Sequence, residues 1–165
     1  MLATTSLACF TNAETVTSRN TVKLDKQTST QEKLAKLESS FDRHIGVYAI
    51  DTGNNEIVKY RANELFPVQS TFKLMGVATL LKQSTNNKTL LQEKIHYTKN
   101  DLIFWHPITG KYLTSGMTLE ALAGAAISYS DNPAINLIMK KLGGPEVVTE
   151  FAHSIGNKSF NVSKF

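Results

Sequence analysis

The amino-acid sequence predicts an α+β fold in which one helix and one β-hairpin precede a cluster of at least four helices. Apolar residues recur at helical spacing over residues 31–43, which indicates the first helix. Residues 45–61 contain two short runs of strand character around Thr52-Gly53-Asn54-Asn55, a sequence typical of a turn, and so predict a hairpin. Apolar segments with helix start and stop signals then follow between residues 70 and 156.

Three of these segments carry clear local signals. Residues 70–82 are apolar on both sides, so we expect a helix that is buried all round. Thr118 is suited to cap the next helix, over residues 119–128, which consist almost entirely of Leu, Ala, Gly and Ile. Pro133 suits the first turn of a third helix, and Gly143-Gly144 suits its end.

Composition divides the chain into four regions. Residues 1–13 are uncharged and rich in small residues, and they resemble the end of a signal peptide without its basic n-region; a frayed N-terminus is the alternative. Residues 14–30 are polar and predict a flexible tether. Residues 31–61 form the helix and hairpin, and residues 62–165 form a helical domain. Because a two-stranded sheet is marginally stable alone, this order suggests that strands pairing with the hairpin are missing.

Several classes of function are disfavoured by composition. The 18 basic residues against 14 acidic ones are scattered rather than clustered, so we expect no nucleic-acid partner. The single cysteine, Cys9, excludes an internal disulfide. No apolar stretch approaches the ~18–20 residues of a membrane span. The histidines are too widely spaced to suggest a metal site, and neither a metal nor a cofactor is expected: His44, His96, His106 and His153.

Ser70 and Lys73 begin the first apolar helix with the sequence Ser-Thr-Phe-Lys. A step of three residues places both side chains on the same face of a helix. The helix N-terminus and burial both disfavour a charged ammonium, so we expect a lowered pKa for Lys73 and an amine that acts as base toward Ser70. The alternative is a capping serine beside a lysine that extends out of the core.

Ser130, Asp131 and Asn132 lie between two apolar segments, directly before Pro133. Proline disfavours helical backbone at the residue before it, so we expect a non-helical Asn132 and three polar side chains on a tight loop. Helix capping by Asp131 or Asn132 is the alternative. Capping accounts for one polar residue, but not for a hydroxyl, a carboxylate and an amide together.

The two motifs, in this order and at this spacing, resemble those of class A serine β-lactamases. The resemblance extends over residues 31–160 and implies the N-terminal part of the two-part fold of β-lactamases and penicillin-binding proteins. The helical part is then largely present, and the sheet part is reduced to one helix and one hairpin. Other segments that resemble the family are Phe66-Pro67, Gly116-Met117-Thr118, Leu142-Gly143-Gly144-Pro145 and Phe151-Ala152-His153-Ser154-Ile155-Gly156.

The resemblance implies three catalytic residues. Ser70 would be the nucleophile that attacks the lactam carbonyl, and Lys73 would transfer protons to and from it. Ser130 would pass a proton to the departing lactam nitrogen.

It also implies a substrate-binding and a structural group. Asn132 would bind the side-chain amide of the substrate and help to fix the catalytic lysine. Trp105 would lie at the rim of the binding cleft, with ordinary packing beside Pro107 as an equal alternative. Asp131 would be structural and would brace the loop.

Other parts of the family pattern are not found in this sequence. There is no Lys-Thr-Gly or Lys-Ser-Gly, and no loop with the glutamate that activates the deacylating water. Loss of one oxyanion-hole donor costs ~10²–10³ in rate. Loss of a general base typically costs ~10²–10⁴. We therefore expect a truncated chain that has little or no turnover when it acts alone.

By this resemblance the function is hydrolysis of β-lactam antibiotics through an acyl-serine, and hence antibiotic resistance. The alternatives are a fragment of a D,D-peptidase or penicillin-binding protein, and an inactive truncated-gene product or penicillin-binding stub. The Gly-Met-Thr and Leu-Gly-Gly-Pro segments favour the lactamase. The expected partner is a small-molecule β-lactam, and we expect a monomer, with a missing C-terminal segment as the one protein partner left open. The family implies a periplasmic or secreted protein, but the incomplete signal peptide argues against export of this chain.

Overall fold

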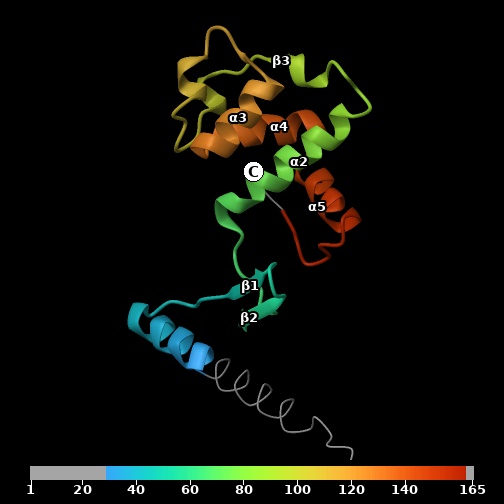
Figure 1. Ribbon diagram of the computed structural model, residues 1–165. Coiled ribbons are helices and arrows are strands. Elements are labelled where there is room, and N and C mark those ends of the chain that lie inside the picture. The colour runs from blue at the N-terminus through green and yellow to red at the C-terminus, as the bar shows by residue number, and fades with distance from the viewer. Residues whose placement is uncertain (1–28, 163–165) are drawn as a thin grey trace, which may run out of the picture. The chain divides into compact units, whose positions relative to one another are not determined.

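In the computed structural model, the described residues are 29–162, and they form two compact units that divide between Phe66 and Pro67. The first unit holds a helix and a hairpin, and the second holds a helical cluster with two short strands (Figure 1). This mixture of helix and strand confirms the predicted fold class. Residues 1–28, with the expected signal-peptide remnant, Cys9 and most of the tether, lie outside the described residues. The predicted tether ends too late, because residues 29 and 30 are already helical.

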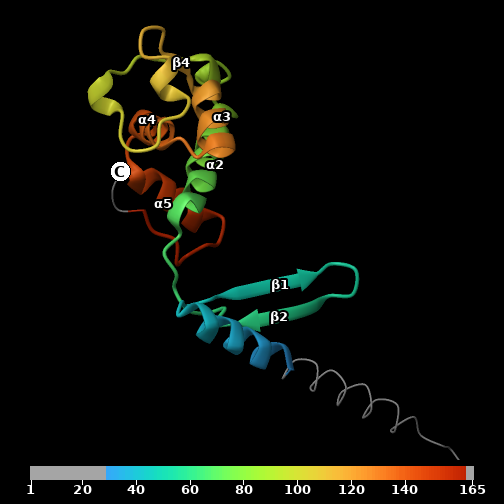
Figure 2. The same ribbon diagram turned by 90° about the vertical axis from the view of Figure 1, so that its left-hand side faces the viewer.

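The first unit contains the predicted helix and hairpin. Residues 29–41 are helical, and strand β1 (Val47–Asp51) pairs antiparallel with β2 (Glu56–Tyr60), as Figure 2 shows. The turn closes with a 2.7 Å hydrogen bond from the Asn55 amide to the carbonyl of Asp51. Asn55 has a φ of 57°, a left-handed conformation that asparagine tolerates well. The Asn-rich turn sequence therefore has a direct structural role.

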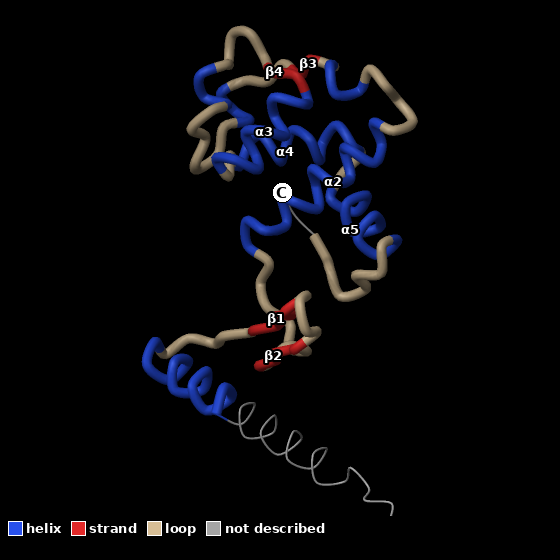
Figure 3. Tube along the Cα trace, viewed as in Figure 1, coloured by secondary structure: helices blue, strands red, loops and turns tan. Residues whose placement is uncertain are grey.

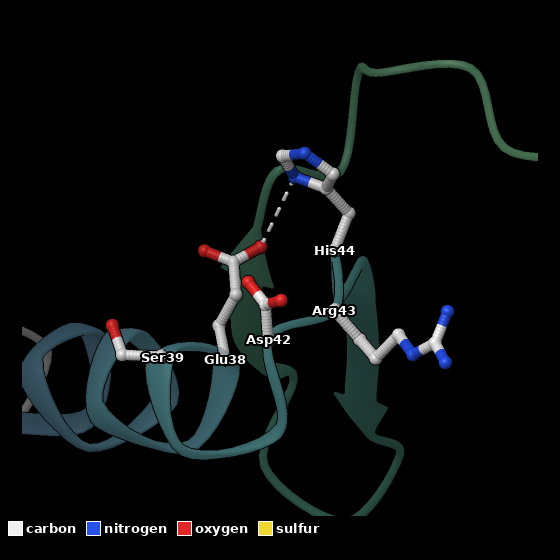
Figure 4. Close-up of a pocket in the computed structure, with 5 residues that line it drawn as sticks. All are labelled: Glu38, Ser39, Asp42, Arg43 and His44. Carbon is white, nitrogen blue, oxygen red and sulfur yellow. Dashed lines mark ion pairs between the residues drawn. The ribbon is translucent and has the colours of Figure 1, made fainter.

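Glu38 connects the helix of this unit to its hairpin. Its carboxylate accepts hydrogen bonds from the Tyr60 hydroxyl at 2.7 Å and from the Arg61 Nε at 3.1 Å, both at Oε2. The Ile45 amide donates to Oε1 at 3.0 Å. These bonds, that from Tyr60 foremost, lower the pKa of Glu38 to about 2. Figure 4 shows the Glu38 carboxylate facing the ring of His44, 3.5 Å away, beside a shallow pocket that is also lined by Ser39, Asp42 and Arg43.

The first unit has no buried core of its own. None of the residues 29–66 is fully buried. The apolar side of the helix leaves Leu37 and Phe41 exposed by 46% and 66%, and β1 leaves Tyr48 and Ile50 exposed by 56% and 51%. One helix and two strands offer too little surface to cover these side chains. This agrees with the expectation that a lone hairpin is a marginal sheet.

The second unit is a cluster of helices around a common core. It contains α2 (Phe72–Ser84), α3 (Leu119–Tyr129), α4 (Asn132–Leu142) and α5 (Pro145–Ser154), which confirm the predicted helices. Helix α2 packs against the other three, and α3 packs against α4 (Figures 1 and 2). No helix within residues 29–162 is long and apolar enough to span a membrane. Large side chains with no exposed surface include Leu80, Leu119, Leu122, Ile135, Ile138, Met139 and Val148.

Gly76 allows α2 and α4 to approach closely. A Cβ at this position would lie 2.5 Å from the Cδ1 of Ile135, a distance that real side chains essentially never show. Glycine is therefore favoured here by the close approach of the Ile135 side chain rather than by its own backbone angles.

The expectation that α2 is buried all round is wrong. Leu80 is fully buried, but Leu74 and Leu81 are 61% and 49% exposed. Within residues 67–162, α3, α4 and α5 cover only part of the surface of α2. An apolar sequence therefore predicted more burial than these neighbours provide.

The segment between α2 and α3 contains a small sheet that the sequence did not predict. Strand β3 (Lys94–Ile95) pairs antiparallel with β4 (Met117–Thr118), both red in Figure 3. Two-residue strands are too short to show an alternating pattern. Thr118 caps α3 as predicted, since its hydroxyl accepts a 3.1 Å hydrogen bond from the Ala121 amide. Short 3₁₀ turns in this unit span Gln69–Thr71, Leu90–Gln92, Lys99–Asp101 and Thr109–Lys111.

Candidate active site

Ser70 and Lys73 lie where the 3₁₀ turn Gln69–Thr71 leads into α2. Ser70 is exposed, whereas Lys73 is only 2% exposed. The Lys73 Nζ lies 3.4 Å from the Ser70 Oγ, so the predicted pair is formed. Gln69, directly before the serine, has a φ of 46°, which places the serine at a sharp backbone turn.

The buried ammonium group of Lys73 is surrounded by neutral oxygen atoms. It donates to the carbonyl of Ser130 at 2.7 Å, to the Ser130 Oγ at 2.8 Å and to the Asn132 Oδ1 at 2.6 Å. No carboxylate is among these hydrogen-bond partners. Burial lowers the pKa of Lys73, and the charge of nearby Asp131 opposes this shift. The direction is the one expected from the sequence.

Ser130 completes a triangle of side chains with this pair. Its Oγ donates to the Ser70 Oγ over 3.1 Å. Each of Ser70, Lys73 and Ser130 is thus within hydrogen-bonding distance of the other two. A hydroxyl in contact with an amine that can release its proton is an activated nucleophile, and a second hydroxyl can carry that proton onward.

The Ser130 loop differs in detail from the expectation. Ser130 ends α3 in a left-handed conformation with a φ of 54°. Asp131 is extended and caps α4, and Asn132 is already the first residue of that helix. The prediction of a non-helical Asn132 is therefore wrong. A residue before proline prefers extended backbone, but here the helix cap formed by Asp131 outweighs that preference at Asn132. The extended residue is therefore Asp131, one position earlier than predicted.

Asp131 is fully buried and braces two segments. It accepts hydrogen bonds at 2.9 Å from the amides of Ile108 and Thr109, and at 2.9 Å from the Thr109 hydroxyl. The Ala134 amide donates to it at 3.0 Å, which is the helix cap. Sequence reasoning did not find Thr109, because a threonine in a predicted loop carries no local signal of what it contacts.

Asn132 and Trp105 are joined through the backbone. The side-chain amide of Asn132 donates to the carbonyl of Phe104 at 2.8 Å, and its backbone amide donates to the carbonyl of Trp105 at 3.1 Å. The Trp105 indole donates to the carbonyl of Tyr129 at 2.9 Å and is 54% exposed. Trp105 thus lies beside the Ser130 loop with an exposed face, and not in the core.

The six predicted site residues therefore lie at the start of α2, between α3 and α4, and in the segment that places Trp105 beside Tyr129. No group of three or more His, Cys, Asp and Glu side chains within residues 29–162 is placed to hold a metal ion. What the side chains offer is a nucleophilic hydroxyl, an amine and a second hydroxyl.

Comparison with known proteins assigns the chain to a family. The model of the β-lactamase enzyme family matches residues 29–165. The chain belongs to this family. A carbapenem-hydrolyzing β-lactamase KPC of Klebsiella oxytoca is 48% identical over 134 residues, which are 81% of this chain and 46% of that protein. A β-lactamase of Bacillus amyloliquefaciens is 43% identical over 162 residues, 97% of this chain and 51% of that protein.

Solved structures of β-lactamases agree with the fold. The class A β-lactamase of Mycobacterium abscessus has a TM-score of 0.79 at 38% identity, covering 81% of this chain and 52% of that one. A β-lactamase of Desulfarculus baarsii DSM 2075 has a TM-score of 0.80 at 36% identity, covering 84% and 51%. The resemblance to class A β-lactamases is thus confirmed. The chain spans about half the length of the curated relatives that it matches.

Proposed function

We propose that this chain carries the acylating half of a serine β-lactamase site, in which Ser70 opens a β-lactam ring and forms an acyl-serine. The observation that carries the proposal is the environment of Lys73: a lysine that is 2% exposed, with neutral hydrogen-bond acceptors, 3.4 Å from an exposed serine hydroxyl. Membership of the β-lactamase family supports the lactam as substrate.

The first step uses the neutral form of Lys73. Its amine accepts the proton of Ser70 as the Oγ bonds to the lactam carbonyl carbon, which gives a tetrahedral oxyanion and an ammonium. Burial without a carboxylate partner favours the neutral amine that this step requires.

The second step uses Ser130. As the tetrahedral intermediate collapses and the C–N bond breaks, the Ser130 hydroxyl protonates the departing nitrogen. The Lys73 ammonium, 2.8 Å from the Ser130 Oγ, then returns a proton to it. The net result is the transfer of one proton from Ser70 to the ring nitrogen, with Ser130 reprotonated and Lys73 neutral again.

Asn132 and Trp105 are proposed as binding groups. The Asn132 side chain holds the ammonium of Lys73 through its oxygen and the Phe104 carbonyl through its nitrogen. The half-exposed ring of Trp105 offers an apolar surface beside the Ser130 loop for the non-reacting part of the substrate.

Release of the acyl group is proposed to be slow in these 165 residues. The hydrogen bonds at the Ser70 hydroxyl come from Lys73 and Ser130, and no carboxylate takes part in them. Hydrolysis of an acyl-serine needs a base that activates water, and a missing base typically costs ~10²–10⁴ in rate.

Burst kinetics with nitrocefin, whose colour changes when its ring opens, test this proposal. We expect a burst of about one equivalent per chain followed by a slow phase. Ser70→Ala should abolish the burst. Ser84→Ala should retain it, because Ser84 lies at the far end of the same helix and its hydroxyl donates to the local carbonyl of Leu81. No burst in the wild-type chain, or a burst that survives Ser70→Ala, contradicts the proposal.

A further inference from the structure

The carboxylate of Asp131 is buried, and within residues 29–162 it has no cationic hydrogen-bond partner. Its side chain is 0% exposed, and its donors are the amides of Ile108, Thr109 and Ala134 and the hydroxyl of Thr109. The hydrogen bonds that stabilise this negative charge thus come from neutral donors, and the Lys73 ammonium acts on it through its charge without a hydrogen bond. Thr109 supplies two of these neutral donors, one from its backbone and one from its side chain.

Thr109 is itself held in place. It is 0% exposed, and its carbonyl accepts a 2.8 Å hydrogen bond from the Tyr97 hydroxyl. Burial raises the pKa of Tyr97 to about 12, so this hydroxyl keeps its proton and remains a donor. Thr109 is thus held by hydrogen bonds to Asp131 and from Tyr97.

Asp131 in turn fixes the two residues beside it in the chain. Its amide donates to the carbonyl of Ala125 in α3 at 3.3 Å, and its carboxylate caps α4. On one side lies Ser130 in its left-handed conformation, and on the other lies Asn132. These two residues provide three of the four hydrogen-bond acceptors of Lys73.

We propose that Thr109 is a positioning residue for the acylation of Ser70: its hydroxyl and amide hold the Asp131 carboxylate, and through it Ser130 and Asn132, against the amine of Lys73. The inference rests on the proposed function for its kinetic consequence. The geometry that it describes can be tested without any reaction.

Loss of the Thr109 hydroxyl should change both the position and the charge environment of Lys73. The charge of Asp131 acts on two titratable groups near it, Lys73 and Tyr97, and raises the pKa of both. The negative charge of Asp131 raises the pKa of Lys73 against the effect of burial. If that charge is held less firmly, the pKa of Lys73 should fall further.

The test compares Thr109→Val, which removes the hydroxyl at nearly constant shape, with Thr109→Ser, which keeps it. Thr79→Val is the matched control. Thr79 is 2% exposed, and its hydroxyl donates to the carbonyl of Met75 in its own helix at 2.7 Å, so the control also loses a buried hydroxyl. Two quantities are measured: the NMR titration of the Lys73 side chain, and the rate of benzylpenicillin acylation, separated from apparent affinity.

At a pH where Lys73 is neutral in both proteins, we expect Thr109→Val to slow acylation about 10- to 100-fold, as a displaced catalytic group does. The titration of Lys73 should move to lower pH. Thr109→Ser and Thr79→Val should both resemble the wild type. If Thr109→Val does not fold, Tyr97→Phe is tested instead. This substitution removes the hydrogen bond to the Thr109 carbonyl but keeps the Thr109 hydroxyl. The Lys73 titration is then expected to move in the same direction, to lower pH.

The proposal is overturned if Thr109→Val, or Tyr97→Phe in its place, behaves like Thr79→Val in both measurements. It is also overturned if Thr109→Ser differs from the wild type in its Lys73 titration and its acylation rate. A wild-type chain that is not acylated contradicts the proposed function instead. In that case the titration of Lys73 alone decides whether Thr109 positions the site.

Discussion

The side-chain oxygen of Asn132 lies 2.6 Å from the Nζ of Lys73, across 59 positions of the sequence. This contact joins the start of α2 to the start of α4. It supplies a neutral acceptor to a buried ammonium, and it leaves the amine next to Ser70. The lysine is therefore held by dipoles and not by a carboxylate, which is the condition under which it can exchange protons.

Acylation should depend on the neutral form of Lys73. Because burial lowers its pKa from 10.5, the acylation rate should rise with pH and level off with a midpoint below that value. Lys73→Ala should slow acylation by ~10²–10⁴. Lys82→Ala, an exposed lysine on the same helix, is the control and should have no effect. The measurement is the pH profile of benzylpenicillin acylation, and a rate independent of pH between 6 and about 10 would count against this role of Lys73.

Removal of the Asp131 carboxylate should destabilise the second unit. Asp131→Ala leaves the buried amide and hydroxyl of Thr109 without their acceptor, and an orphaned buried group costs ~1–3 kcal/mol. Asp101→Ala is the comparison, since Asp101 completes the cap of a short turn near the surface by accepting a hydrogen bond from the amide of its N-cap, Thr98. Loss of that cap should cost only about 1 kcal/mol. Urea unfolding measures the free energy of unfolding of both variants. Equal losses of stability would show that the burial of Asp131 does not increase the cost of removing its carboxylate.

Much of the helical unit and its site could be predicted because the signals are local. The Ser70–Lys73 step, the Thr118 cap and the Gly143-Gly144 stop each depend on neighbours in the sequence, and each is present in the structure. The approach of Ser130 to Ser70 was implied only by the family resemblance, because it depends on how two helices pack. The hydrogen bonds between Thr109 and Asp131 could not be predicted from any sequence pattern, because they join a loop to the start of a helix 22 residues away.

A side chain at position 76 should be destabilising, and the effect should depend on Ile135. Gly76→Ala places a Cβ 2.5 Å from the Cδ1 of Ile135, and overpacking of this kind costs ~1–3 kcal/mol. Ile135→Val alone should cost ~0.5–1.5 kcal/mol. Because valine lacks that Cδ1, the double variant should be more stable than the sum of the two losses predicts. Thermal unfolding of the wild type, the two single variants and the double variant gives the coupling energy between positions 76 and 135. Additive losses of stability would argue against this contact.

The first unit should lose stability in acid through Glu38. Its pKa is lowered from 4.5 to about 2, so the folded state favours the carboxylate. The stabilisation of the folded first unit by the Glu38 carboxylate is complete above pH 4.5 and disappears as the pH falls toward 2. NMR signals of the hairpin should therefore weaken over this range in the wild type but much less in Glu38→Gln. Glu56→Gln, at the hairpin turn, is the control and should behave like the wild type.

Burial was the least predictable property of this chain. The apolar residues of the first helix and of α2 follow the pattern of buried faces, yet Phe41 and Leu74 are 66% and 61% exposed. Hydrophobic periodicity reports which face of an element is apolar. It does not report whether another element lies against that face, and within each described unit none covers these side chains completely.

The intact mass of the chain after exposure to benzylpenicillin shows whether Ser70 is an activated nucleophile for β-lactams. We expect the mass to increase by one penicillin molecule per chain, with no increase in Ser70→Ala and a greatly reduced one in Lys73→Ala. If the folded wild-type chain gains no mass, or if Ser70→Ala gains it, then Ser70 does not have this role.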